Sequence, residues 1–446
     1  MRDFLPDEVR RREHVIGVIA AVYERYGFEP LQTPAVENID TLMGKYGEEG
    51  DKLIFKILKR GEQEGPAVAD LALRYDLTVP LARVVAEYRG KLPRFFKRYQ
   101  IQPVWRADRP QRGRFREFYQ CDVDAVGSRS TIVEIEICAA ASEALATLGF
   151  ADFAIRLNHR QVLSGLLDAA GVEQARHGDA LVALDKLDKI GPHGVEQELL
   201  ARGLRPAVAA GFLRVFAGEP AAEAGGTSWD PANAARLAHL EMALADHAAG
   251  RAGVQALREI VAGAGRTAAA GRLRIDPALA RGLSYYTGAI MEIAVPDLAG
   301  SLGGGGRYDH LVGMFLGEDV PACGFSLGLE RIIVVMSERG MFPPTLLGTP
   351  ADVLVTVFNA AGVGDSLALA CELRRGGLRV DVYPEVDKVG KQFKYASGRG
   401  VPLVAVLGDD ELARGEVTIK DLRSGEQVSL ARAQVAESIR ARLTSP

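Results

Sequence analysis

The sequence predicts a mixed α/β fold in three parts: an α+β core, a helical insertion within that core, and a small α/β domain at the C-terminal end. Residues 31–126 contain strand-like runs, whereas residues 172–270 are rich in alanine and have a helical pattern. From residue 351 onward, short apolar strands alternate with helical segments. The length of 446 residues also exceeds what one core usually holds. The expected boundaries are 1–171 and 271–340 for the core, 172–270 for the insertion, 341–350 for a linker and 351–446 for the final domain.

The core is expected to begin with a helix from Pro6 to Gly27, because proline suits the first helical position and glycine commonly follows the last. The apolar face of this helix consists of Ile16, Ile19, Ala20 and Tyr23. A second helix is predicted from Thr131 to Leu148. Between the two helices, the strand-like runs are DKLIFKILKRGEQEG, DLALRYDLT, RFFKRYQIQPVWRAD and EFYQCDVDAVG.

After the insertion, strand texture returns at Gly282 with the run LSYYTGAIMEIAV. The glycines from Gly303 to Gly306 predict a hairpin turn, since they lack both the lysine of a Walker loop and the spacing of a dinucleotide-binding loop. The run ACGFSLGLER then predicts a strand that leads into a helix, and SERGMFPPTLLGTP predicts a linker. The strands predicted in the final domain are ADVLVTVF, LRVDVY and PLVAVLG.

Composition excludes several classes of protein. With 48% hydrophobic and 25% charged residues, the chain is typical of a globular protein rather than a disordered one. The scattered cysteines argue against structural zinc and disulfides, and they fit a reducing compartment. These cysteines are Cys121, Cys138, Cys323 and Cys371. The first residues are charged, and no apolar stretch approaches the roughly 20 residues that cross a bilayer. We therefore expect a cytoplasmic protein with no metal site and no membrane contact.

A basic stripe lies within a chain whose net charge is −4. Between Arg89 and Arg116 there are ten lysines or arginines and one acid, Asp108. Such a stripe can bind phosphates while the rest of the surface remains acidic. A solvated, charged loop explains the same composition equally well.

Two strand-like runs carry polar side chains where a buried strand should be apolar. Alternation places Phe118, Gln120, Asp122 and Asp124 on one face, opposite Tyr119, Cys121, Val123 and Ala125. In the run DLALRYDLT, the same alternation places Arg74, Asp76 and Thr78 together. Burying such polar groups without hydrogen-bond partners costs several kcal/mol. We therefore expect these faces to line a polar cavity and to form its floor. A strand with one face in solvent is the alternative for either run.

Arginines adjoin these strands and turns. Their planar guanidinium groups match phosphate in shape and keep their charge when partly desolvated. Surface ion pairing is the more common role of any single arginine. The arginines in question are Arg106, Arg112, Arg114, Arg116, Arg281 and Arg331.

At these residues the sequence resembles a known family. The stretch FKRYQIQPVWRADRPQRGRFREFYQCDVDAVG resembles motif 2 of class II aminoacyl-tRNA synthetases, and GFSLGLERI resembles motif 3. GFEPLQTPAVE resembles motif 1, whose proline, here Pro34, lies at a dimer interface. LRYDLTVPLAR and RGLSYYTGAIME resemble segments specific to the histidyl-tRNA synthetases, although Ser284 stands where that family usually has aspartate. The loop from Ala107 to Gly113 is also shorter than in the eukaryotic-like relatives.

The resemblance implies an antiparallel class II sheet flanked by helices, with a helical insertion and a C-terminal α/β anticodon-binding domain. It also implies ATP-dependent activation of L-histidine to histidyl-adenylate, followed by transfer to the 3′ end of tRNA(His). ATP would then be a substrate, with Mg²⁺ expected beside it, and the partners would be histidine, tRNA(His) and a second copy of the chain. Positioned cations would supply most of the acceleration, because the reaction brings two anions together.

The same resemblance assigns roles to individual residues. The residues implied as catalytic are Arg106 and Arg281, at the α-phosphate and the substrate carboxylate. The residues implied to bind histidine are Asp76, Thr78, Arg106, Gln120, Asp124, Arg281, Tyr285 and Tyr286, with Asp124 and Tyr285 at the imidazole. The residues implied to bind ATP are Arg106, Arg114, Phe118 and Arg331. The residues implied to contact the tRNA acceptor end are Arg109, Gln111 and Arg112.

Two alternatives keep part of this interpretation. A synthetase-like regulatory subunit of ATP phosphoribosyltransferase would share the core but lack the final domain, which is present here as residues 351–446. A non-catalytic RNA-binding module would use the basic stripe alone and leave the histidine-pocket residues without a purpose. The presence of both features favours the enzyme.

Overall fold

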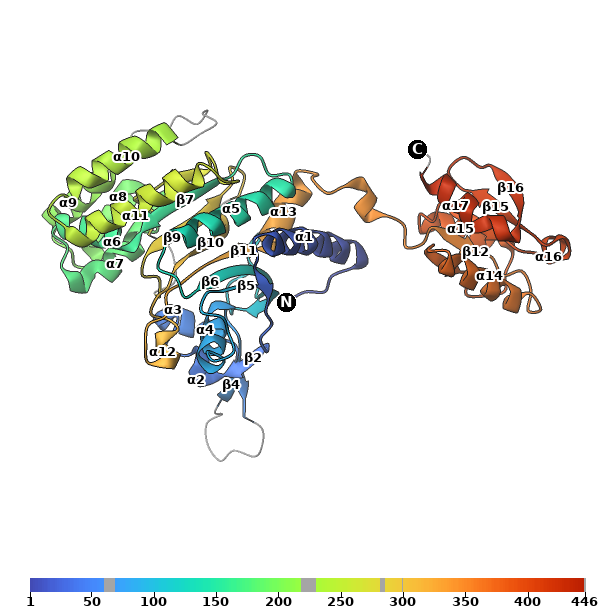
Figure 1. The fold of residues 1–446 in the computed structure, drawn as a ribbon, viewed down its shortest axis with the longest axis horizontal. Helices are drawn as coiled ribbons and strands as arrows, with labels where there is room; N and C mark the ends of the chain where they lie inside the picture. The colour runs from blue at the N-terminus through green and yellow to red at the C-terminus, as the bar shows by residue number, and fades with distance from the viewer. Residues whose placement is uncertain (60–68, 218–229, 281–284, 299, 445–446) are drawn as a thin grey trace. The chain divides into compact units, whose positions relative to one another are not determined.

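The computed structural model describes the chain except for residues 60–68, 218–229, 281–284, 299 and 445–446 (Figure 1). The described residues form two compact units, Met1–Phe342 and Pro343–Pro446. Each unit has its own sheet and its own apolar core, and each is described by itself.

An eight-stranded sheet organises the first unit. From one edge to the other its strands are β1 (Glu29–Pro30), β5 (Phe96–Trp105), β6 (Glu117–Val126), β11 (Ala322–Gly328), β10 (Ser301–Arg307), β9 (Ala289–Ala294), β7 (Ala154–His159) and β8 (Leu273–Ile275). Pairing is antiparallel from β5 to β7 and parallel only at the two edges. The predicted strand runs around β5 and β6 are therefore paired along their whole length, as neighbours in the centre of the sheet.

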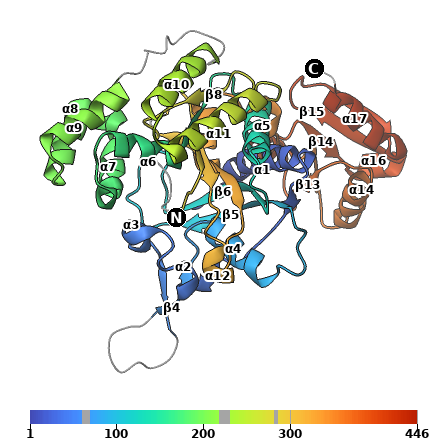
Figure 2. The same cartoon turned by 60° about the vertical axis from the view of Figure 1, so that its left-hand side comes forward.

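Helices cover one face of this sheet (Figures 1 and 2). They are α1 (Pro6–Arg25), α5 (Ile132–Thr147), α11 (Ala248–Ala264) and α13 (Leu329–Glu338). The helix α1 starts at the predicted proline and ends two residues before Gly27, which has a φ of 75°. Its buried side includes Val15, Ile19 and Val22, which pack in the same apolar cluster as Cys121 of β6. The alternation of apolar residues thus fixes which face of β6 meets the helices.

A smaller part of the first unit lies at the other face. Its strands and helices are β2 (Val36–Asn38), α2 (Ile39–Leu42), α3 (Gly47–Asp51), β3 (Lys56–Leu58), β4 (Ala69–Leu73), α4 (Thr78–Glu87) and α12 (Gly313–Leu316). The predicted grouping of Arg74, Asp76 and Thr78 on one strand face is wrong, because β4 ends at Leu73 and α4 begins at Thr78. Arg74 instead donates from Nη1 to the Thr33 carbonyl oxygen at 2.7 Å, while Asp76 accepts from the Val79 amide and stabilises the start of α4.

The glycine run is also not the predicted hairpin turn. Residues 301–307 form the central strand β10, between β9 and β11. A Cβ atom on Gly305 would lie 2.1 Å from the Gly324 carbonyl oxygen, and one on Gly306 would lie 2.4 Å from that of Ala289. Glycine is needed here because neighbouring backbones approach closely, which is its other common role besides turns.

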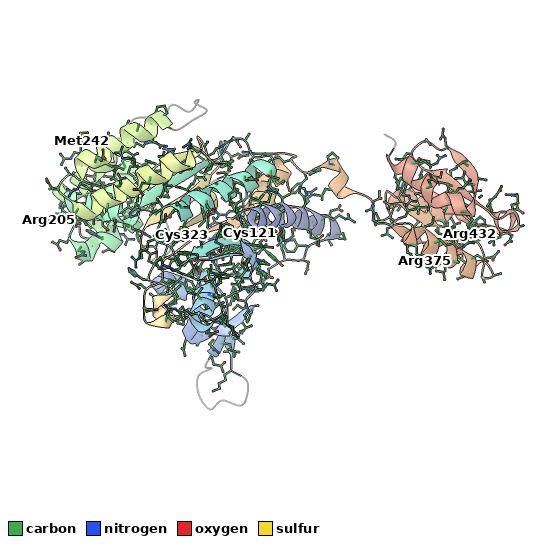
Figure 3. The ribbon with its side chains drawn as sticks, in the orientation of Figure 1. Cys121, Arg205, Met242, Cys323, Arg375 and Arg432 are labelled. Atoms are coloured by element: carbon green, nitrogen blue, oxygen red, sulfur yellow. The ribbon has the colours of Figure 1, made fainter. Side chains whose placement is uncertain are left out.

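A run of helices follows β7 and packs beside the sheet (Figure 2). These helices are α6 (Arg160–Ala169), η1 (Gln174–Arg176), α7 (His177–Leu184), α8 (Leu187–Ala201), α9 (Pro206–Ala217), α10 (Asp230–Ala243) and α11. Their apolar residues, such as Leu199 and Leu257, belong to the same cluster as the sheet core. The labelled Met242 lies at the surface of this region and is 73% exposed, whereas Cys121 and Cys323 lie buried in the sheet (Figure 3).

The second unit is a five-stranded sheet with helices. Its strands, from edge to edge, are β13 (Val380–Val382), β12 (Val353–Val355), β14 (Leu403–Val406), β15 (Glu416–Asp421) and β16 (Gln427–Ala431). The first three strands are parallel, and β15 and β16 add an antiparallel hairpin that the sequence interpretation did not include. Its helices are η2 (Pro344–Leu347), α14 (Val363–Arg375), α15 (Val389–Gly398), α16 (Asp409–Arg414), η3 (Arg432–Gln434) and α17 (Val435–Thr444).

All four cysteines are free. None of the helices within the described ranges has the length and apolarity that a membrane span requires.

A buried ion pair joins β10 to α5. Arg307 donates to both carboxylate oxygens of Glu134, at 2.6 and 2.8 Å, and its Nη1 donates to the Ser128 carbonyl oxygen at 2.9 Å. Both charged side chains are at least nine-tenths buried. Bidentate geometry offsets the cost of removing these charges from water, but only while both partners are present.

We predict that Arg307→Ala lowers the free energy of unfolding by about 3–5 kcal/mol, because it leaves the Glu134 carboxylate buried without its partner. The matched control is Arg89→Ala, which removes the exposed pair with Glu318 and should cost less than about 1 kcal/mol. Urea denaturation of the three proteins measures both values. An equal fall in the free energy of unfolding in the two variants would show that the buried pair stabilises the fold no more than the exposed pair does.

Candidate active site

A cavity of about 400 Å³ lies over the sheet face that the helices leave uncovered. Its floor is made by β6, β9, β10 and β11, and its wall by the segments around Asp76 and Tyr285. The structure brings together most of the residues that the sequence singled out. The predicted site residues that line the cavity are Asp76, Thr78, Arg106, Arg114, Phe118, Gln120, Asp124, Tyr285, Tyr286 and Arg331. Arg281 lies outside the described residues.

The strand β6 supplies the central part of the floor. Phe118, Gln120, Asp122 and Asp124 all face the cavity, as period-two alternation requires, while Cys121 and Val123 face the helices. Along the strand, an aromatic ring is followed by an amide and then by two carboxylates. The polarity of the cavity therefore changes along one strand.

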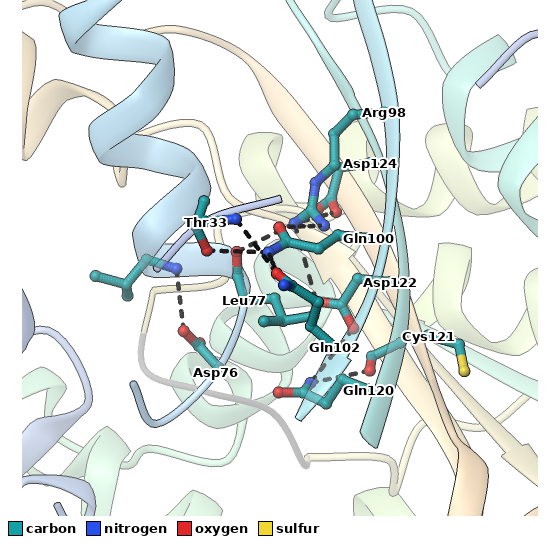
Figure 4. A network of polar contacts seen from close by, with 12 residues as sticks. Thr33, Asp76, Leu77, Arg98, Gln100, Gln102, Gln120, Cys121, Asp122 and Asp124 are labelled. Carbon is teal, nitrogen blue, oxygen red and sulfur yellow. Dashed lines mark hydrogen bonds and ion pairs between the residues drawn. The ribbon is translucent and has the colours of Figure 1, made fainter. Parts of the chain in front are cut away.

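A buried arginine lies beside the two carboxylates, nearer to Asp124 than to Asp122 (Figure 4). Arg98, on the neighbouring strand β5, is fully buried and places Nη2 at 2.8 Å from Asp124 Oδ2 and 3.9 Å from Asp122 Oδ2. It also donates to the Leu77 carbonyl oxygen at 3.2 Å and to Gln100 Oε1 at 3.2 Å. The guanidinium of Arg98 thus lies within ion-pair distance of both carboxylates.

Burial raises the pKa of these acids. Desolvation, helped by the nearby Asp124 carboxylate and opposed by Arg98, raises the pKa of Asp122 to about 7. Desolvation also raises the pKa of Asp124, although Arg98 and the Tyr308 hydroxyl oppose that shift. A ligand cation entering this end would favour the ionised carboxylates and replace the solvation that burial removes.

A third carboxylate, Asp76, lies nearby and is held by tyrosines. Its Oδ1 accepts from the Tyr46 hydroxyl at 2.9 Å, and its Oδ2 accepts from the Tyr285 hydroxyl at 3.2 Å. The Tyr308 hydroxyl donates to Asp124 Oδ1 in the same way. Burial raises the pKa of Tyr285 and Tyr308 well above the usual value, so both hydroxyls keep their protons and act as donors.

The opposite end of the cavity is cationic and aromatic. The Arg106 guanidinium lies 5.1 Å from the centre of the Phe118 ring and 4.3 Å from that of Tyr75. Arg106 Nε donates to the Tyr75 carbonyl oxygen at 3.0 Å, which fixes the side chain beside the cavity. Stacking on two rings holds the positive charge of Arg106 in place at the cavity wall.

Two further arginines lie at this end. Arg331, at the start of α13, donates from Nε to the Gly113 carbonyl oxygen at 3.3 Å and from Nη1 to that of Ser301 at 2.5 Å. Arg114 pairs with Asp108 at 2.7 Å. Two arginines of the loop between β5 and β6 and one of α13 therefore line the same cavity, where they can bind several phosphate groups.

The three residues expected at the acceptor end do not line the cavity. Arg109, Gln111 and Arg112 are exposed and belong to the short loop between β5 and β6. The Gln111 and Arg114 backbones bond to each other at 2.9 and 3.1 Å, and Arg112 pairs with Glu338. The basic residues between Arg89 and Arg116 do not all lie on one surface, because the side chain of Arg98 is buried in the protein.

Several lining residues were not among the predicted site residues. Asp122 was placed on the polar face but given no role, and Tyr308 follows a glycine run that was interpreted as a turn. Glu330 accepts from Arg12 Nη1 at 2.8 Å and from the Tyr119 amide at 2.9 Å, which ties α13 to α1 and β6. The period-two pattern could have identified Asp122, whereas only the long-range strand pairing shows the position of Tyr308.

Comparisons with known proteins agree with this arrangement. The family model described as histidyl-tRNA synthetase matches residues 1–332, and the one described as anticodon binding domain matches residues 352–442. The histidine–tRNA ligase of Flavobacterium johnsoniae is 41% identical, over 96% of this chain and 95% of its own. That of Gloeobacter violaceus is 42% identical, over 100% of this chain and 98% of its own.

Solved structures show the same fold. The histidyl-tRNA synthetase from Nostoc sp. PCC 7120 has a TM-score of 0.78 and 34% identity, and the match covers 99% of this chain and 97% of that one. An ATP phosphoribosyltransferase regulatory subunit/histidyl-tRNA synthetase from Bacillus halodurans has a TM-score of 0.68 at 19% identity, over 88% and 94% of the two chains, which supports the fold alone.

The predicted fold class, with its flanked antiparallel sheet and C-terminal α/β anticodon-binding domain, is confirmed. Full-length relatives that are named as ligases do not favour the regulatory-subunit alternative. The chain belongs to the histidyl-tRNA synthetase family.

Proposed function

We propose that this chain is a histidine–tRNA ligase, which activates L-histidine with ATP and transfers it to the 3′ end of tRNA(His). The observation that carries this proposal is the division of one cavity into a carboxylate and tyrosine end and an arginine and aromatic end. Histidine brings a cationic amino group and an imidazole to the first end, and ATP brings phosphates and a flat base to the second. Full-length similarity to histidine–tRNA ligases supports the same reaction.

At the first end, we assign the α-amino group to Asp76, Thr78 and Gln120, with Asp122 behind them. Asp124 accepts one imidazole N–H, because a carboxylate is the acceptor that an imidazole donor prefers. A tyrosine hydroxyl meets the other ring nitrogen. Tyr285 was assigned this role by resemblance, but its hydroxyl already donates to Asp76, so Tyr286 is the better placed of the two. Other amino acids would leave these buried groups unpaired and are rejected for that reason.

At the second end, Phe118 stacks on adenine, and Arg114 and Arg331 bind the distal phosphates. A carboxylate oxygen of histidine attacks the α-phosphorus, the bond to the bridging oxygen breaks, and pyrophosphate leaves. Arg106 and, by the family resemblance, Arg281 neutralise charge on the non-bridging oxygens. A terminal ribose hydroxyl of the tRNA then attacks the carbonyl carbon, and AMP leaves.

Magnesium enters this scheme bound to the phosphates of ATP. Over the ranges that the structure describes, no three histidine, cysteine, aspartate or glutamate side chains are grouped as metal ligands.

The remaining proposals concern partners. The loop residues Arg109, Gln111 and Arg112 contact the acceptor end of the tRNA, and residues 351–446 bind the anticodon. Pro34 lies at the interface of a homodimer, as the resemblance to motif 1 implies. The compartment that fits these partners is the cytoplasm.

The proposed function is tested by ATP–pyrophosphate exchange with each of the twenty amino acids, where only histidine should support exchange. Arg281→Ala should slow histidine-dependent exchange by roughly 10²–10³-fold with histidine binding largely intact, because one stabilising donor is lost in the transition state. The control is Arg89→Ala, a surface arginine outside the cavity, which should exchange normally. Near-normal exchange by Arg281→Ala would remove Arg281 from the mechanism, and exchange with another amino acid would overturn the substrate.

We predict that KM for histidine in the exchange reaction rises as the pH is lowered from 8 to 6. Asp122 has a pKa of about 7, so it is ionised at pH 8 and takes up a proton at pH 6, which removes a negative charge that faces the amino group. The imidazole of free histidine titrates in the same window. Asp122→Asn therefore serves as the reference, since it keeps the substrate titration and loses that of Asp122. Parallel pH profiles for the two proteins would contradict the assignment.

The role of the second unit gives a further prediction. A chain ending at Gly348 should retain histidine-dependent exchange, because the whole cavity lies within Met1–Phe342. It should lose most tRNA charging, because anticodon affinity is assigned to residues 351–446. Charging assays at several tRNA concentrations measure this loss as a rise in KM. Equal charging by the full-length and shortened chains would contradict the assignment.

A further inference from the structure

Arginine and aromatic side chains alternate in a chain of contacts beside the cavity. The guanidinium carbon of Arg2 lies 4.5 Å from the centre of the Phe115 ring and 4.8 Å from that of Phe4. The guanidinium carbon of Arg12 lies 4.1 Å from the centre of the Phe4 ring and 4.8 Å from that of Tyr119. We call these five side chains, in the order Phe115, Arg2, Phe4, Arg12 and Tyr119, the N-terminal stack.

One end of the N-terminal stack is fixed to the core. Arg12, on α1, donates from Nη1 to Glu330 Oε1 at 2.8 Å, and the exposed fractions of the two side chains are 9% and 3%. Glu330 Oε2 accepts from the Tyr119 amide at 2.9 Å. Breaking a buried ion pair leaves an uncompensated charge, so Arg12 and Tyr119 keep fixed positions.

The other end of the N-terminal stack belongs to the loop between β5 and β6. Phe115 follows Arg114 in that loop, and both residues line the cavity. The Arg114 side chain is about half exposed and pairs with Asp108, a residue of the same loop. Phe115 therefore connects a loop that carries a proposed phosphate-binding arginine to the segment that precedes α1.

Arg2 and Phe4 lie between these two ends. Neither side chain lines the cavity, so neither touches a substrate there. Arg2 Nη1 lies 3.8 Å from Glu8 Oε1, and the two side chains are 42% and 44% exposed. An exposed ion pair at this distance contributes little to stability. Stacking on two rings therefore restrains the Arg2 side chain more than this ion pair does.

Ordering a loop on binding costs free energy, and holding the loop in its bound conformation beforehand removes part of that cost. We propose that Arg2 and Phe4 are positioning residues for the phosphate end of the cavity. Through the N-terminal stack they hold Phe115, and with it Arg114, where Arg114 can bind the distal phosphates of ATP. This inference rests on the proposed function and adds two residues that act on ATP binding from outside the cavity.

The test is ATP–pyrophosphate exchange by full-length chains that carry Arg2→Ala or Phe4→Leu. Both changes remove cation–ring contacts but no group that lines the cavity. We expect KM for ATP to rise about two- to fivefold, which corresponds to the loss of one exposed cation–ring contact. KM for histidine and kcat should not change, because the carboxylate end is held by other contacts. Phe4→Tyr keeps the ring and should have the KM for ATP of the unsubstituted chain.

A double-mutant cycle tests whether Arg2 acts through Phe115. Phe115→Leu removes the ring at the loop end of the N-terminal stack, so Arg2→Ala added to it should raise KM for ATP no further. Additive effects of the two changes would show that Arg2 acts by another route, and would overturn the proposal.

Arg10→Ala is the matched control. Arg10 lies near the start of α1, pairs with Asp7 at 2.7 Å and belongs neither to the N-terminal stack nor to the cavity lining. Its removal should leave the KM values for ATP and for histidine unchanged. Thermal unfolding of every variant shows whether a change in KM accompanies a loss of stability.

Two further outcomes would overturn the proposal. An unchanged KM for ATP in both Arg2→Ala and Phe4→Leu would mean that the N-terminal stack does not position the loop. Equal rises in KM for ATP and for histidine, with a lower unfolding temperature, would make the stack a general contribution to the fold. Absence of histidine-dependent exchange by the unsubstituted chain would reject the proposed function instead, whatever the variants do.

Discussion

The cavity floor depends on the buried guanidinium of Arg98. Asp122 and Asp124 are two residues apart on the same face of β6 and both are buried, so without a nearby cation their charges would repel each other. Arg98 is itself held by the Leu77 carbonyl oxygen and by Gln100. The segment that precedes α4 is thereby fixed to the centre of the sheet, so the wall and the floor of the cavity share one anchor. Removing either partner of such a buried group leaves the other uncompensated.

The fold class could be predicted because the central strands follow simple alternation. In β6, every second residue is apolar and faces the helices, so a single strand shows both the core side and the cavity side. The helix α1 could be recognised by its proline start and by Ile19 and Tyr23 on its apolar side. These features depend on residues close in the sequence. They do not require knowledge of strand order.

The errors arise where a distant segment decides the structure. Gly303–Gly306 has the composition of a turn, and only the close approach of β9 and β11 makes it a strand. The position of Tyr308 beside Asp124 follows from that strand, so it could not be predicted either. The predicted strand through Arg74 was continued past the end of β4 at Leu73, whereas the Asp76 carboxylate accepts from the Val79 amide at the start of α4. Tertiary contacts override local composition in each case.

The site is part of the core, and this has a consequence for its rigidity. β6 carries Asp122 and Asp124 toward the cavity and Cys121 and Val123 into the main apolar cluster, so the carboxylates cannot move without moving the packed side. Glu330 adds a second restraint, since it holds the Tyr119 amide of the same strand and the Arg12 guanidinium of α1. Groups placed this way keep their positions before a ligand arrives, and little reorganisation is needed when charge develops.

The arginine end differs, because Arg114 is about half exposed and its loop lies outside the sheet. Fixed carboxylates for the amino acid and a more exposed Arg114 for the distal phosphates suit a site that must select one amino acid, bind ATP and then release pyrophosphate.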